Sequence, residues 1–476
     1  MSRRSLPLLL ATTLLAAQGP TVAEPPLRAH LAFLADPLLE GRGTGQRGGE
    51  LAVRYLETQL QVLGLRPVQG TSYRQPVDLV GIRTDPGRSI LSFGGGGACA
   101  TPAFGTDLVY GAGQPTANLR IEAPVVFVGY GIHAPEEGWD DYKGLDAQGK
   151  VLIMLGNEPG PTAAEPTRFG GQDLTYYGRW TYKFEEAARR GAAGVLLIHT
   201  PASASYGWSV VQHGWDTERF QLAGEAGTPL QGWLSEAEAR KLLTQGGQNL
   251  AELTEQAQSR AFRPVALDLR AEGTLVSEVR TLRQANVAGL VPGTDPTLGR
   301  EAVIYSAHWD HLGATRAPGA STPAIYPGAV DNASGCAALL AMAQAALQHP
   351  ARRSQLFLFV CAEEQGLLGS RAYVAHPLWP LAQTVADLNL DSLNFVAPTR
   401  DIGLPFASRS TLGDLGAAVA KADHLLLAAP RPDTAGGYFR SDHYSFVQAG
   451  VPAVSIHGGH DYVGPDPAAL KAEADA

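Results

Sequence analysis

The sequence predicts an α/β fold, in which a mixed and mostly parallel sheet carries helices on both faces. Short apolar runs alternate with helix-forming segments, as at 302–308 followed by 333–347, and at 356–361 followed by 366–374. This alternation is typical of a sheet covered on both sides. Each run also ends in a residue that can bind a divalent metal or move a proton. Open α/β sheets place their sites at the carboxyl ends of strands, so we expect a site there.

The first of these strand ends carries His308 and Asp310. Alternate residues of a strand point to the same face, and a carboxylate so placed could accept the second ring N–H of a histidine ligand. Another strand end carries two adjacent carboxylates, Glu363 and Glu364. Like charges beside an apolar strand are costly unless a cation or a proton compensates them. A metal ion would supply that compensation.

One imidazole among several carboxylates suits zinc, and the number of acids predicts two ions that share one of them. In two-metal hydrolases the ions lie roughly 3.5–4 Å apart, activate a water and polarise the scissile carbonyl. One paired glutamate would then be a ligand and the other the general base. Each motif alone has an ordinary alternative, since His308 could lie in a solvated loop and Asp331 could cap a helix. Several such coincidences at successive strand ends favour a site.

Four segments together resemble one known family. They are His308-Trp-Asp310, Gly-Ala-Val-Asp331-Asn-Ala-Ser-Gly335, Glu363-Glu364 and Leu-Asn-Leu-Asp391-Ser. The resemblance is to the co-catalytic zinc aminopeptidases, whose relatives include glutamate carboxypeptidase II, glutaminyl cyclase and the transferrin receptor. It implies the zinc exopeptidase fold and four metal ligands, namely His308, Asp331, Glu364 and Asp391. Asp331 would bridge both zinc ions, and Glu363 would be the general base. Asp310 would not bind zinc itself but would act as a partner of the ligands.

The rest of the chain sets the broad class. Its 476 residues, 45% of them hydrophobic, allow a large core and two or three domains. The net charge is −9 and Lys and Arg do not cluster, so we expect neither nucleic acid nor an anionic membrane surface as a partner. Three cysteines are too few for a disulfide framework, and the runs around Cys336 and Cys361 favour small buried side chains.

Residues 1–23 read as a secretory signal peptide, with Arg3 and Arg4 before an apolar run at 6–17 and small residues at 21–23. The apolar run is too short to span a bilayer, so we expect no stable membrane insertion. The mature protein is therefore predicted to be secreted or periplasmic.

Domain organisation follows from composition and from the same resemblance. Residues 24–111 would form the first part of the catalytic domain, and they include Gly41-Arg-Gly-Thr-Gly45, which matches the family and is expected to pack on the sheet. The β-rich segment 112–268 contains Trp139-Asp-Asp-Tyr-Lys-Gly and resembles an inserted protease-associated domain. Residues 269–476 would complete the catalytic domain.

The final segment departs from the family pattern. Ser-Asp442-His443 matches the family, but the Tyr-His-Thr/Gln-Pro-x-Asp motif that supplies its last zinc histidine is not found before Ala476. We therefore expect the carboxyl-terminal end to be shortened and the second zinc site to be weaker. His457 and His460 are late histidines outside any matching motif, and no ligand role is assigned to them.

The sequence thus predicts a zinc exopeptidase, most simply an aminopeptidase that acts on peptide substrates. Two alternatives stay open. A carboxypeptidase or glutaminyl cyclase would use the same scaffold, and a carboxypeptidase would need basic residues such as Arg371, Arg409 or Arg440 for the substrate carboxylate. A non-catalytic binding module or an inactive, truncated homologue is the other alternative, and Glu363 argues against it.

Overall fold

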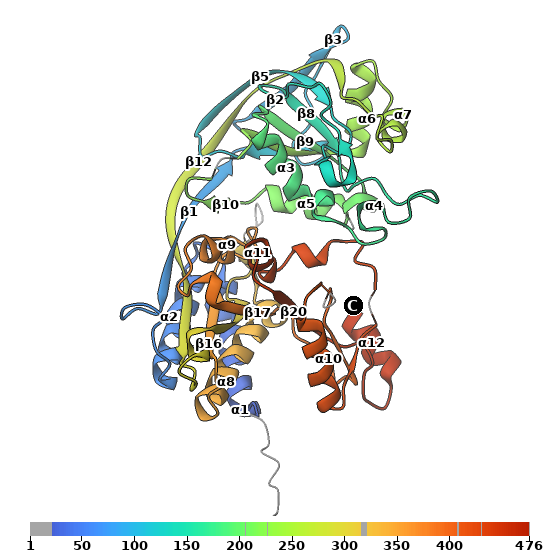
Figure 1. Ribbon diagram of the computed structural model, residues 1–476. Coiled ribbons are helices and arrows are strands. Elements are labelled where there is room, and N and C mark those ends of the chain that lie inside the picture. The colour runs from blue at the N-terminus through green and yellow to red at the C-terminus, as the bar shows by residue number, and fades with distance from the viewer. Residues whose placement is uncertain are drawn as a thin grey trace, which may run out of the picture.

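The computed structural model describes residues 21–204, 206–225, 227–315, 321–406, 409–429 and 431–475. Its main feature is a 16-stranded sheet whose principal path runs β19-β18-β20-β17-β13-β16-β12-β5-β8-β9-β11-β4. The long strand β12 (Val265–Val291) pairs with strands on both sides of the path. Figure 1 shows β12 running from a part with β16, β17 and β20 to a part with β5, β8 and β9.

The first part contains the strands that carry the predicted site. Four strands pair in parallel: β13 (Ala302–His308), β16 (Ser354–Val360), β17 (Thr384–Leu390) and β20 (Ala453–Gly458). The segment of β12 beside β16 is antiparallel, as is β1 (Arg74–Thr84) against β12. The far edge is made by β18 (Asp401–Gly403) and β19 (Leu426–Leu427). The sheet is therefore mixed and mostly parallel at the site, which confirms the predicted class.

Helices cover both faces of this part (Figure 1). They are α1 (Glu24–Leu34), α2 (Arg47–Leu63), α8 (Gly335–Gln348), α9 (Leu368–Ala375) and α11 (His443–Gln448). The helices α10 (Leu412–Ala422) and α12 (Pro467–Asp475) lie to the side of β20 (Figure 1). Alternate residues of β16 enter different cores. Phe357 and Phe359 pack in a cluster with side chains of α2 and α8, whereas Leu358 packs in one with Tyr373 of α9 and Phe446 of α11. Both faces of β16 are thus buried, which explains its uninterrupted apolar sequence.

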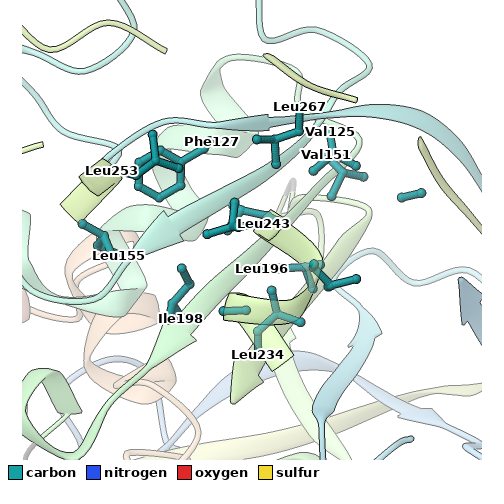
Figure 2. Packing of buried hydrophobic residues seen from close by; sticks show 14 of the residues in the cluster. Val125, Phe127, Val151, Leu155, Leu196, Ile198, Leu234, Leu243, Leu253 and Leu267 are labelled. Atoms are coloured by element: carbon teal, nitrogen blue, oxygen red, sulfur yellow. The ribbon is translucent and has the colours of Figure 1, made fainter. Parts of the chain in front are cut away.

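The second part is a sheet with a core of its own. Its strands are β4 (Leu108–Ala112), β5 (Asn118–Phe127), β8 (Val151–Leu155), β9 (Gly194–His199) and β11 (Leu230–Ser235). Its helices include α3 (Trp180–Arg189), α5 (Trp208–Trp215), α6 (Glu236–Gln245) and α7 (Leu250–Gln256). Figure 2 shows side chains of β5, β8 and β9 packed against Leu243 of α6 and Leu253 of α7. The assignment of 112–268 as an inserted protease-associated domain stays a prediction.

Four shorter strand pairings are also present. They involve β2 (Ile90–Gly95) with β3 (Ala98–Ala100), β1 with β10 (Arg219–Leu222), β6 (His133–Ala134) with β7 (Trp139–Asp140), and β14 (Gly313–Thr315) with β15 (Ala324–Tyr326). Within the described ranges, no helix is long and apolar enough to cross a bilayer. The predicted signal peptide lies mainly outside the described residues, since the description begins at residue 21.

Candidate metal centre

The predicted site residues come from the carboxyl ends of neighbouring parallel strands. His308 is the last residue of β13, and it is in register with Val360, the last residue of β16. Glu363 and Glu364 follow β16, and Asp391 directly follows β17. Because these strands are parallel, their carboxyl ends meet at one edge of the sheet, as the sequence predicted.

One group of possible ligands surrounds the imidazole of His308. Its Nε2 atom lies 3.0 Å from Oδ1 of Asp331 and 3.4 Å from Oδ1 of Asp391. The three side chains offer ligand atoms that all lie within 4.8 Å of one another. One nitrogen and two carboxylate oxygens form a donor set that suits zinc.

A second group lies beside the first and shares one residue with it. His311, Asp331 and Glu364 also offer ligand atoms within 4.8 Å of one another. Nδ1 of His311 is 2.6 Å from Oε1 of Glu364. Asp331 belongs to both groups, and it lies in the turn η6 (Ala329–Ser334) that precedes α8. This arrangement places Asp331 where a bridging ligand would be.

Unsatisfied polar atoms support the fit to a metal. Nε2 of His308 and Oδ1 of Asp331 are buried, and neither has a hydrogen-bond partner of acceptable geometry within the described part of the chain. Buried polar atoms are normally hydrogen-bonded, so each such exception needs an explanation. A cation between them would satisfy both. The residues present therefore fit a zinc site.

Electrostatics at His308 point the same way. Burial alone lowers the pKa of this imidazole, but the carboxylates of Glu363 and Asp391 raise the pKa well above its usual value. For Asp391, burial raises the carboxyl pKa, yet His308 and Ser441 together bring that pKa below its usual range. The carboxylates thus draw a positive charge to Nε2. A divalent cation would satisfy the same attraction and leave the imidazole neutral.

Glu363 occupies a largely buried position beside these groups. Its Oε2 lies 3.9 Å from Nε2 of His308, and 11% of its side chain is exposed. Burial raises the pKa of Glu363 well above its usual value. The backbone N–H of Glu363 donates to Oδ1 of Asp310 over 3.1 Å. Asp310 therefore fixes the start of the loop that carries Glu363.

Asp310 contacts His308 less directly than the sequence suggested. Nδ1 of His308 lies 3.1 Å from the backbone oxygen of Asp310 and 3.9 Å from its carboxylate. The Asp310 side chain is fully buried, and burial raises its carboxyl pKa to about 6. The backbone oxygen is thus the nearer partner of the imidazole, while the carboxylate holds the Glu363 loop.

A buried chain of hydrogen bonds supports Asp391. The hydroxyl of Ser441 donates to Oδ2 of Asp391 over 2.6 Å, and Nδ2 of Asn389 donates to Ser441 Oγ over 2.6 Å. Ser306 Oγ in turn donates to Oδ1 of Asn389 over 3.1 Å. Asn389 and Ser306 are fully buried. Hydrogen bonds to a ligand's second oxygen orient it toward the metal.

Sequence reasoning assigned roles to His308, Asp331, Glu364, Asp391, Glu363 and Asp310, and all six lie together here. It missed His311 and Ser441. His311 directly follows Asp310, three residues after His308, and Ser441 begins the Ser-Asp-His segment. Within the described residues, His457 and His460 belong to neither ligand group.

Two of the three arginines considered for a substrate carboxylate have other contacts. Arg371 forms an ion pair with Glu225. The guanidinium of Arg409 lies 4.5 Å from the ring centroid of Phe406 and 4.7 Å from that of Tyr438. Arg440 is exposed and directly precedes Ser441.

Comparison with known proteins identifies the part of the chain that carries the site. Residues 286–473 match the model of peptidase family M28. Leucine aminopeptidase 1 of Trichophyton rubrum is 28% identical over 183 residues, which cover 36% of this chain and 47% of that protein. Leucine aminopeptidase 1 of Metarhizium robertsii is 28% identical over 194 residues, or 38% of this chain and 47% of that protein. The matches thus span about half the length of these curated relatives.

A solved structure extends the similarity of fold to most of the chain. The aminopeptidase from Aneurinibacillus sp. strain AM-1 aligns with a TM-score of 0.53 at 20% identity. The alignment covers 95% of this chain and 92% of that one. All six predicted site residues lie within the segment that matches the family model. The match of residues 286–473 to the model of peptidase family M28 supports the resemblance to the co-catalytic zinc aminopeptidases.

Proposed function

We propose that this protein is a zinc-dependent aminopeptidase, which hydrolyses the N-terminal peptide bond of peptides. The observation that carries the proposal is the sharing of Asp331 between two groups of metal-binding side chains, with Glu363 beside them. A structural metal site is usually closed by four protein ligands. Each group here has three, which leaves positions for water and substrate.

The ligands divide between two sites. His308, Asp331 and Asp391 would hold one zinc ion, and His311, Asp331 and Glu364 would hold the other. Zinc bound there would supply a Lewis acid for the scissile carbonyl and lower the pKa of water. In the family, a histidine from a later motif completes the second site. Here His311 is the imidazole that lies beside Glu364.

Glu363 would move the proton. Its carboxylate would accept a proton from the attacking water and then donate that proton to the leaving amine. Two features support this role. The side chain is close to the ligands without belonging to either group, and burial favours its protonated form, so it can hold the proton between the two transfers. Asp310 keeps the carboxylate in place through the backbone of Glu363.

The substrate class follows from the charge of the site and from the relatives. A free α-amino group is a cation, and the acidic side chains of the site could hold it. That contact would confine cleavage to the chain end. The matched fungal relatives are named leucine aminopeptidases, so an apolar N-terminal residue is the first substrate to test. We also propose export, by means of the predicted signal peptide at residues 1–23.

The proposal is tested by hydrolysis of aminoacyl anilides, starting with the leucyl anilide, with and without a zinc chelator. Wild type should be active and chelator-sensitive, and Glu363→Gln should remove activity. Glu238→Gln is a matched control, since Glu238 is also buried but lies in α6 and pairs with Lys241. Cleavage of N-acetylated peptides from their carboxyl end would indicate a carboxypeptidase instead. A folded, zinc-loaded protein that hydrolyses neither would indicate a binding module.

A further inference from the structure

The glycine-rich segment 41–46 lies directly against the loops that carry the metal ligands. Gly43 forms a parallel bridge with His311, and Oε1 of Gln46 accepts a hydrogen bond from the backbone N of Ala314 over 3.0 Å. Gly41 has a φ of +70°, and a Cβ there would lie 2.4 Å from the backbone oxygen of Tyr326. The segments 41–46 and 313–326 therefore approach each other too closely for a side chain at Gly41.

Arg42 is the centre of this contact. Its side chain is almost completely buried, and within the described residues it donates only to backbone oxygens. Nε donates to the oxygen of Trp309 over 2.8 Å, and Nη2 donates to the oxygen of Gly328 over 2.8 Å. Nη1 donates to Pro327 over 2.6 Å and also to Leu34.

Three of these acceptors, all except Leu34, belong to two different ligand loops. Trp309 lies between His308 and Asp310, whereas 327–328 leads into the turn with Asp331. One planar guanidinium therefore ties the loop of the first histidine to the loop of the shared carboxylate. Its donors form a rigid fork, so the two loops are held at a fixed separation.

The charge of Arg42 suits the same place. Burying a guanidinium is costly unless opposite charges compensate it. Favourable interactions with the carboxylates of Asp310, Asp331 and Glu364 oppose that cost. A neighbouring residue, Thr44, adds a hydrogen bond from its hydroxyl to Oδ2 of Asp310 over 3.4 Å.

We propose that Arg42, assisted by Thr44, is a positioning residue that sets the distance between His308 and Asp331, and through it the affinity for metal. The inference rests on the proposed function, because it requires that the two groups bind zinc. It assigns a role in the site to a segment that precedes the family-matched residues 286–473.

The test compares Arg42→Lys with Arg168→Lys in the full chain. Arg168 is a matched control because its side chain is 6% exposed and binds backbone oxygens, with Nε 2.8 Å from Gly160 and Nη1 3.2 Å from Gln258. Zinc affinity is measured by competition with a chromophoric chelator, and site geometry by the visible spectrum of the cobalt-loaded protein. Arg42→Lys should lower zinc affinity roughly 10- to 100-fold, the range typical of residues that orient ligands, and change the cobalt spectrum. Arg168→Lys should change neither.

The outcomes separate the two hypotheses. If wild type binds neither zinc nor cobalt, the proposed function fails. If wild type binds both ions, and Arg42→Lys binds them equally well with the same spectrum, Arg42 has no positioning role. Should Arg42→Lys fail to fold by circular dichroism, the near-isosteric Thr44→Val is measured in the same way. A several-fold loss of zinc affinity with an altered spectrum supports the inference, and unchanged values overturn it.

Discussion

Replacement of Ser441 by alanine would test whether a single hydroxyl orients the ligand Asp391. Ser441 Oγ donates to Oδ2 of Asp391 and accepts from Nδ2 of Asn389, both over 2.6 Å. The substitution removes both bonds at once. Asn389 is fully buried, so its amide would lose a partner that water cannot easily replace.

The expected magnitude follows from these two bonds. Leaving a buried donor unpaired costs about 1–3 kcal/mol, and a hydrogen bond to a charged group contributes about 1.5–3 kcal/mol. Allowing for local relaxation, we expect the free energy of unfolding, measured in chelator, to fall by about 2–3 kcal/mol. Zinc affinity should fall roughly 10- to 100-fold, because Asp391 would no longer be held in its binding orientation.

A matched variant separates orientation of the ligand from general destabilisation. Ser445 is also buried, and its hydroxyl lies 2.9 Å from that of Ser370, which is not a proposed ligand. Ser445→Ala should lower stability by about 1 kcal/mol and leave zinc affinity unchanged. Urea unfolding and chelator competition measure the two quantities. Equal zinc affinity in Ser441→Ala and wild type would refute the reasoning.

Three further predictions concern stability. Burial, reinforced by His457, lowers the pKa of His443 to about 4. Because the folded state then binds a proton less readily than the unfolded state, the free energy of unfolding should fall by up to about 3 kcal/mol as pH falls from 6.5 to 4. In chelator, His443→Gln should show a smaller loss, and an identical pH profile would contradict this. Gly41→Ala should lower the free energy of unfolding by about 2 kcal/mol or more. Gly64→Ala, where the added Cβ meets open space, should lower it by about 1 kcal/mol. Equal urea midpoints for the two variants would disprove the close contact at Gly41. Zinc at 1,000 times its dissociation constant should add about 4 kcal/mol, and an unfolding temperature insensitive to chelator would exclude a tightly bound ion.

The fold could be predicted because its central strands are buried on both faces. In β16, Phe357 and Phe359 enter one core and Leu358 enters the other, so the sequence is apolar without interruption. The helix predicted at 333–347 is α8, which runs from Gly335 to Gln348. Strand-forming and helix-forming composition is a local property of the sequence, and it can be recognised without knowing any long-range contact.

The four predicted ligands could be found for a related reason. Each lies at or just after the end of a strand, or in the turn before a helix, where polar residues stand out against apolar neighbours. His311 and Ser441 also lie near such motifs, but their positions in the sequence did not indicate their roles. His311 lies in a loop whose position depends on a bridge to Gly43, and Ser441 bonds to Asp391 across 50 residues of sequence. Their roles depend on long-range contacts that spacing does not encode.

The distribution of charge explains why the acidic ligands could be predicted and the residues that support them could not. Acidic side chains that follow apolar strands are evident in the sequence, and their mutual repulsion indicates that a positive charge must be nearby. What supplies that charge depends on the tertiary structure. Arg42 reaches the site from the amino-terminal segment, and the carboxylates of Asp310, Asp331 and Glu364 partly offset the cost of burying its charge. One arginine cannot neutralise all of these carboxylates, so metal ions would have to supply the remaining positive charge. The same repulsion that marks the site in the sequence would therefore provide much of the affinity for zinc.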